Sequence, residues 1–284
     1  MIAKIIKKVV CVEEGVVLEL LSIELWLMMS GIIFCATFTQ VLTGFGFGLV
    51  AVPLLLFILP SQQALLAGMI LSMLSSAMQG VQMRHLARWD LIFRLLLFSI
   101  PGLVLGIILS EYINGLYIKG IVGSVLISYV GWQWFRLKTP PSEAATADES
   151  DGADQGLKTF SLVFILVALS SGLLNGLAAI PGPPIVALLI KYLKKDAFQA
   201  TTVNFFFLQY AMTSISKAVL FQGNFTFPFA VLLASMILAI VLGYLIGQPI
   251  RKRINEDQFK KVVYGLLLII GLTSVGEPIF TLLN

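Results

Sequence analysis

Long apolar runs, separated by short polar or charged stretches, cover most of this chain of 284 residues. A helix needs about 20 predominantly apolar residues to cross a bilayer. The pattern predicts ten hydrophobic segments, five in each half of the chain: 22–43, 47–59, 62–82, 91–110 and 114–135, then 159–178, 183–193, 197–222, 226–249 and 259–281. Segments 47–59 and 183–193 are short. Each of them is therefore either a full crossing or a half-span or re-entrant helix, which gives eight to ten segments that cross.

Two breaks interrupt this pattern at corresponding places. The first is Gly-Phe-Gly-Phe-Gly at 44–48, and the second is Ala-Ile-Pro-Gly-Pro-Pro at 179–184. Sliding one half over the other by 135 residues (179 minus 44) superimposes them, and an apolar run follows each break. Broken hydrophobic segments at matching positions of two halves point to a transporter binding site, because unwound backbone at membrane depth is tolerated only in protein or against a cavity. We expect an all-α polytopic membrane protein of two inverted repeats, each with about five hydrophobic segments and a broken helix.

Composition supports a membrane protein and excludes several other classes. The chain is 58% hydrophobic and only 12% charged, with a mean hydropathy of +0.95, which is outside the range of soluble domains. The two cysteines, Cys11 and Cys35, have no metal-binding spacing, and no basic patch suggests nucleic acid. Paired aspartates, a serine with a histidine base and metal-ligand clusters are missing from the sequence, so we expect neither an enzyme nor a cofactor.

Loop charges predict the orientation. Basic residues occur in alternate loops, at Arg84, His85 and Arg88, at Arg136, Lys138 and Lys158, at Lys191, Lys194 and Lys195, and at Arg251, Lys252 and Arg253. The loops 60–63 and 222–226 carry no charge. By the positive-inside rule the basic loops are cytoplasmic, which places both termini outside if all ten segments cross. Lys4, Lys7 and Lys8 disagree with an outside N-terminus, and the four concordant loops outweigh them.

The same reasoning divides the chain into four regions. We expect residues 1–21 to form an uncleaved interfacial segment, with a signal peptide as the alternative. Residues 22–137 are predicted to be the first membrane repeat, 138–158 a flexible cytoplasmic linker rich in small and acidic residues, and 159–284 the second repeat. An odd number of crossings in each repeat would turn the second repeat upside down relative to the first.

The breaks also suggest how an anion could be held. A helix that restarts within the membrane, near Leu49 and at Pro183, presents free N–H groups and a partial positive charge to an oxyanion. The candidate substrate-binding residues lie at the breaks or on neighbouring helices: Gln40, Thr43, Gly44, Gly46, Gly48, Ser75, Gln79, Asn175, Pro181, Gly182, Pro183, Asn204 and Gln209. For Ser75 and Thr43, a hydrogen bond back to their own helix is the alternative.

Two further expectations concern residues outside this set. Lys217 lies near the end of its segment, where we expect it to snorkel to the interface, with attraction of the anion at the cavity mouth as the alternative. Gly102 and Gly106 are expected to permit close helix packing.

The two break motifs resemble those of the sulfite exporter TauE/SafE family of anion permeases. The resemblance rests on residues 44–55 and 171–184, with support from the loop 84–90 and from Pro101, Gly102 and Gly106. The family pattern usually has Gly-Ile-Gly-Gly-Pro-Pro where this chain has Ala179 to Pro184, and often a glycine at the position of Phe47.

The resemblance implies a secondary transporter that moves a small sulfur-containing anion, sulfite or a short organosulfonate, across the inner membrane. We expect it to work by alternating access. Alternative cargoes are thiosulfate or a carboxylate, and the alternative mechanism is an anion channel. Its partners would be the small anionic substrate and the lipid bilayer, with no nucleic acid. Coupling to a proton or to sodium, and assembly as a homodimer, stay open.

Overall fold

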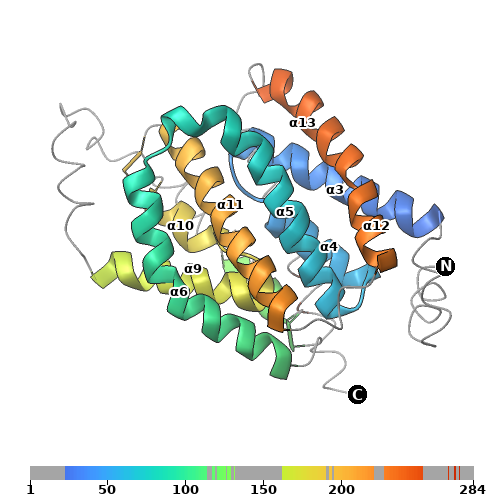
Figure 1. Ribbon diagram of the computed structural model, residues 1–284, viewed down its shortest axis with the longest axis horizontal. Coiled ribbons are helices and arrows are strands. Elements are labelled where there is room, and N and C mark those ends of the chain that lie inside the picture. Colours follow the sequence, from blue (N-terminus) through green and yellow to red (C-terminus); the bar gives the residue numbers. More distant parts are fainter. Residues whose placement is uncertain are drawn as a thin grey trace.

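The structure, a computed structural model, describes residues 23–113, 117–118, 120–125, 127–128, 131, 162–189, 192–193, 195–220, 227–251, 268, 272 and 275. Within this part of the chain every regular element is a helix (Figure 1): α3 Ile23–Thr43, α4 Phe47–Ile58, α5 Ser61–Met83, the 3₁₀ helix η1 Arg84–Leu86, α6 Trp89–Tyr112, α9 Leu162–Ala178, α10 Gly182–Leu189, α11 Lys195–Leu220, α12 Phe227–Ser235 and α13 Ile237–Arg251. The interfacial segment 1–21, the linker 138–158 and most of the segments 114–135 and 259–281 lie outside the described residues.

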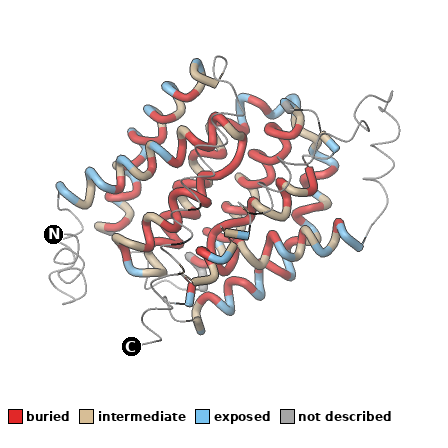
Figure 2. The backbone as a smooth tube through the Cα atoms, turned by 180° about the vertical axis from the view of Figure 1, so that it is seen from behind, coloured by how far each residue is buried: buried red, intermediate tan, exposed pale blue. Residues whose placement is uncertain are grey.

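Among the described residues, four helical stretches are long and apolar enough to cross a membrane: Ile23–Thr43, Ser61–Leu86, Trp89–Tyr112 and Pro228–Arg251. The prediction of an all-α polytopic membrane protein is therefore confirmed for the described chain. Large apolar side chains such as Phe93, Leu97 and Leu245 are exposed on the outer helices, as expected where lipid replaces water. Figure 2 shows that the buried positions fill the interior and that exposed positions follow the outer faces.

Three helix pairs organise the bundle. Helix α6 packs along α9, α13 packs along α3, and α5 packs against α11 (Figure 1). The α6–α9 contact is close because glycines face backbone: a Cβ added at Gly102 would overlap the carbonyl oxygen of Leu169, and one at Gly172 would overlap that of Ser99. The expectation that Gly102 and Gly106 permit close packing is confirmed.

Helices α13 and α3 also pack closely at glycines. A Cβ at Gly243 would lie 2.9 Å from the carbonyl oxygen of Phe34, and one at Gly247 would lie 2.9 Å from the Val41 side chain. Trp26 Nε1 donates a hydrogen bond to Ser235 Oγ at 2.9 Å. Since the sequence numbers rise together in both helices, α3 runs parallel to α12 and α13, as α9 runs parallel to α6.

Polar contacts define two opposite ends of the bundle. At one end, here called the basic end, Arg251 pairs with Asp196 at 3.5 Å and the Arg88 N–H donates to Thr201 Oγ1 at 3.1 Å. At the other, here called the polar end, Gln62 Nε2 donates to the Ser110 carbonyl at 2.8 Å. Helix α4 therefore runs from the first break toward the polar end, where α5 begins, and α10 runs from the second break toward the basic end, where α11 begins.

Candidate substrate-binding site

The first break separates α3 from α4. Gly44 and Gly46 have φ angles of 81° and 106°, a left-handed backbone that glycine adopts without steric cost. Helix α4 begins at Phe47, where the predicted segment 47–59 begins, and its N-cap residue Gly46 provides no side-chain cap for the first N–H groups. Thr43 Oγ1 bonds to the Thr39 carbonyl at 2.9 Å, and also bonds to the Phe45 carbonyl. The alternative for Thr43, a hydrogen bond to its own helix, is thus observed.

The second break separates α9 from α10. Ala179 has a φ of 56°, which is unusual for a residue with a side chain. Its N–H still donates to the Asn175 carbonyl at 2.9 Å. Helix α10 begins at Gly182, and Pro183 occupies its first turn, where the missing N–H costs nothing.

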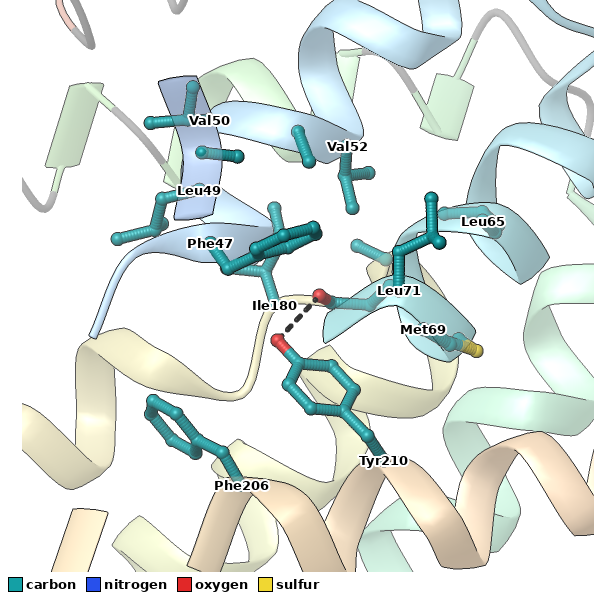
Figure 3. Packing of buried hydrophobic residues seen from close by; sticks show 14 of the residues in the cluster. Phe47, Leu49, Val50, Val52, Leu65, Met69, Leu71, Ile180, Phe206 and Tyr210 are labelled. Carbon is teal, nitrogen blue, oxygen red and sulfur yellow. Dashed lines mark hydrogen bonds between the residues drawn. The ribbon is translucent and has the colours of Figure 1, made fainter. Parts of the chain in front are cut away.

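The two breaks are in contact with each other. A Cβ added at Gly48 would lie 2.7 Å from the Ala179 carbonyl oxygen and 2.8 Å from the Tyr210 hydroxyl. Tyr210 Oη in turn donates to the Ala179 carbonyl at 3.3 Å. Figure 3 shows Phe47 of α4, Ile180 of the second break and Tyr210 of α11 gathered at this point. Segments about 135 residues apart in the sequence thus meet in the interior, and only glycine fits at position 48.

One amide side chain precedes each break and bonds to a long neighbouring helix. Gln40 Nε2 donates to Ser76 Oγ at 2.9 Å, and Gln40 Oε1 accepts from Ser75 Oγ at 3.1 Å, both on α5. Asn175 Nδ2 donates to Thr213 Oγ1 at 2.7 Å and to the Gln209 carbonyl at 3.3 Å, both on α11. The donors of both amides are used within the protein.

Other predicted residues have polar atoms left over. Ser171 Oγ donates to the Pro181 carbonyl at 2.9 Å and lies 3.4 Å from Gln209 Oε1, which places the Gln209 amide at the second break. Within the described residues Gln209 Nε2 has no partner, although the side chain is fully buried. The same holds for both polar atoms of Gln79, which is 1% exposed. Buried amide groups are rarely left unpaired, so Gln79 and Gln209 are the predicted residues best suited to a ligand.

The structure does not bring all predicted residues together. Asn204 is buried between α5 and α11, where its Nδ2 donates to the Ala200 carbonyl at 2.9 Å and to the Gly80 carbonyl at 3.3 Å. Gln199, which sequence reasoning did not select, lies at the first break instead. Its Nε2 donates to the Val41 carbonyl at 3.3 Å, and its side chain fills the space beside Gly44. No pattern in the sequence marks Gln199, because its position depends on how the first turns of α11 lie against the end of α3.

The expectation that Lys217 snorkels to the interface is wrong. The side chain is only 2% exposed, and its Nζ donates to Ser110 Oγ of α6 at 2.8 Å rather than reaching the interface. The physical reason is that α6 ends beside α11, so a protein acceptor lies closer than water. Among the described Lys, Arg, Asp and Glu residues, Lys217 is the one that is buried.

The arrangement at the breaks suits recognition of an anion by neutral groups. The uncapped first turn of α4 and the Gln209 amide are donors, and no acidic side chain is buried among the described residues. No group of three or more His, Cys, Asp or Glu residues that could hold a metal occurs there either. Apolar spanning helices around two interrupted segments are the features of a multi-pass membrane transporter.

Comparison with known families agrees with this class. The family model described as Sulfite exporter TauE/SafE matches residues 29–274, and the chain belongs to this family of membrane anion transporters. No curated protein and no solved structure was found to match the chain.

Proposed function

We propose that the protein is a secondary transporter that moves sulfite or a short organosulfonate across the inner membrane by alternating access. The observation that carries this proposal is the contact between the two breaks at Gly48 and Ala179. The anion would be held where the first turn of α4 meets the second break, with Gln209 Nε2 as a side-chain donor. A site of backbone and amide donors recognises sulfur oxyanions without a cation, so that no buried charge has to be neutralised when the site is empty.

The contacts between helices support two inverted repeats. In the predicted repeats, α3, α4, α5 and α6 correspond to α9, α10, α11 and the α12–α13 pair. This correspondence turns the α6–α9 contact into the α13–α3 contact, and it leaves the α5–α11 contact unchanged. The positions of Gln40 and Asn175 are also related by 135 residues (175 minus 40), and each bonds to the helix that follows the broken segment. Each broken helix would then belong to one repeat, with α4 and α10 starting from the centre in opposite directions.

Alternating access follows from this symmetry in physical terms. Two repeats of opposite orientation can exchange conformations, so that a central site faces first one side of the membrane and then the other. The contact of Gly48 with Ala179 lies where the repeats would move against each other. A side chain at position 48 would hold the breaks apart and distort the site.

A binding panel on the purified protein in detergent tests this proposal. Sulfite, thiosulfate, taurine, isethionate, sulfoacetate and simple carboxylates are compared by thermal shift and by scintillation binding. Sulfite or an organosulfonate should raise the melting temperature, because a ligand that binds only the folded state stabilises it. Saturable flux of the same anion in proteoliposomes would distinguish a carrier from a channel.

Two glycine variants locate the site. Gly48→Ala and Gly243→Ala both place a methyl group against a backbone carbonyl, at 2.7 Å and 2.9 Å, but Gly243 faces Phe34 in the α13–α3 contact, ten residues before the first break. Gly48→Ala should weaken binding of the anion at least tenfold, whereas Gly243→Ala should bind with the wild-type Kd in its folded fraction. Wild-type affinity in Gly48→Ala would contradict a site at the breaks. If only a carboxylate binds, the proposed substrate changes from a sulfur anion to that carboxylate.

A further inference from the structure

The buried ammonium of Lys217 is the feature of the molecule that the site at the breaks leaves unexplained. It lies in α11 at the polar end, three residues before the last residue of that helix. A cation buried in a membrane protein is costly unless it is paired, and such residues commonly face a substrate path. Within the described residues no carboxylate lies within ion-pair distance of Lys217, and the charge of Glu111 acts on it only at longer range.

The partner that Lys217 does have cannot neutralise it. Ser110 Oγ accepts from Lys217 Nζ at 2.8 Å, while its own proton goes to the Ile107 carbonyl at 2.8 Å. An ammonium group has three N–H donors, and Ser110 uses one of them. Two donors and a full positive charge are therefore available to an anion at this point.

A hydroxyl without a partner in the described chain lies on the same face of α11 as the ammonium. Ser214 is three residues earlier on α11, so the two side chains share one face of the helix. Its hydroxyl is buried and has no partner within the described chain. Gln62 of α5 fixes the end of α6 through the Ser110 carbonyl, at 2.8 Å. The ammonium and the Ser214 hydroxyl thus lie on one face of α11, at the junction with the end of α6.

We propose that Lys217 and Ser214 form a second anion-binding station at the polar end, where the transported oxyanion is held before or after it occupies the breaks. This rests on the proposed function and adds a charged site to the neutral one. The ligand class is a small sulfur oxyanion, whose oxygens accept from the ammonium and from the serine hydroxyl. Ser110 keeps one N–H donor of the ammonium, and the anion accepts from the two that remain.

A purely structural role is the competing explanation, because a cation near the last turn of α6 also interacts favourably with the negative end of that helix. The two roles predict different results for the same variants. If the Lys217–Ser110 hydrogen bond is only structural, removal of either partner should have the same effect on the protein. An anion station needs Lys217 but does not need Ser110.

The experiment measures the Kd of the anion identified in the panel, together with the melting temperature without anion, for Lys217→Met, Lys217→Arg and Ser110→Ala. Lys217→Met keeps the length of the side chain and removes the charge, so the Kd should rise at least tenfold. Lys217→Arg should bind within about threefold of wild type, because it keeps the charge. Ser110→Ala should bind as tightly as wild type or more tightly, even where its melting temperature falls.

The outcomes separate this inference from the proposed function. If wild type binds a sulfur anion and Lys217→Met binds it with the same Kd, the second station is wrong and the site at the breaks stands. A rise of the Kd in Ser110→Ala as large as that in Lys217→Met would also overturn the station in favour of a structural tie. If wild type binds none of the anions, the proposed function fails and the station fails with it.

Discussion

At the scale of single residues, two buried glutamines differ in how far their amides are hydrogen-bonded. Gln40 has both ends of its amide bonded, to Ser75 and Ser76, whereas Gln209 has an Nε2 group with no partner among the described residues. Removing the Gln40 amide leaves both serines without it, whereas removal of the Gln209 amide leaves Ser171 Oγ with the Pro181 carbonyl at 2.9 Å in place of its longer contact of 3.4 Å with Gln209 Oε1. The amide of Gln40 therefore stabilises the fold, and that of Gln209 is available to a ligand.

We expect Gln40→Leu to lower the stability by about 1 kcal/mol, because two serine hydroxyls lose their partner. Gln209→Leu should leave the melting temperature close to that of wild type and should weaken binding of the anion several-fold. Thermal unfolding and anion titration of both variants would test this contrast. A large loss of stability in Gln209→Leu with unchanged binding would show that its amide is structural.

The sequence could not reveal these environments, because they depend on contacts between distant segments. Thr43, Gln79, Asn175 and Gln209 share one chemical description as polar residues at a break or on a neighbouring helix. In the structure Thr43 bonds to its own helix, and the Gln79 amide has no partner among the described residues. Lys217 shows the same limit. Snorkelling was expected from its distance to the helix end, and the neighbouring end of α6 was not visible in the sequence.

At the scale of elements, the sequence predicted much more. The hydrophobic segments coincide with helices to within a few residues, for example 62–82 with α5 and 91–110 with α6, because the membrane fixes both length and composition. The breaks were predictable because glycine and proline have strong backbone preferences. Their direct contact through Gly48 was not, since it requires the relative placement of both halves.

The α6–α9 contact gives a prediction at this scale. Gly176→Ala places a methyl group 2.6 Å from the Ile107 nitrogen, in a contact made by backbone on both sides, so neither helix can yield without moving. Overpacking of this kind costs about 1–3 kcal/mol. The melting temperature should fall in Gly176→Ala and should not fall in Gly31→Ala, where an added Cβ meets nothing within 4 Å. Equal melting temperatures for the two variants would contradict the close crossing.

At the scale of the whole molecule, the two ends of the bundle agree with the loop charges. The loops predicted to be cytoplasmic, at Arg84, Lys195 and Arg251, meet at the basic end, while the uncharged loop at Pro60 lies at the polar end. The positive-inside rule uses only the sequence, and the contacts use only the packing of the chain. Their agreement supports one orientation of the described helices and, through it, repeats that are inverted.

Inversion makes a strict prediction for residues that are related by 135 positions. Ser61 begins α5 at the polar end, and its counterpart Asp196 (61 plus 135) lies in the first turn of α11 at the basic end. In a chain whose Cys11 and Cys35 are changed to alanine, Ser61→Cys should react with an impermeant maleimide from outside the cell. Asp196→Cys should react only after the membrane is opened, and a permeant maleimide should label both as the control. Labelling of both positions from the same side would rule out inverted repeats, and alternating access between them, whatever the anion proves to be.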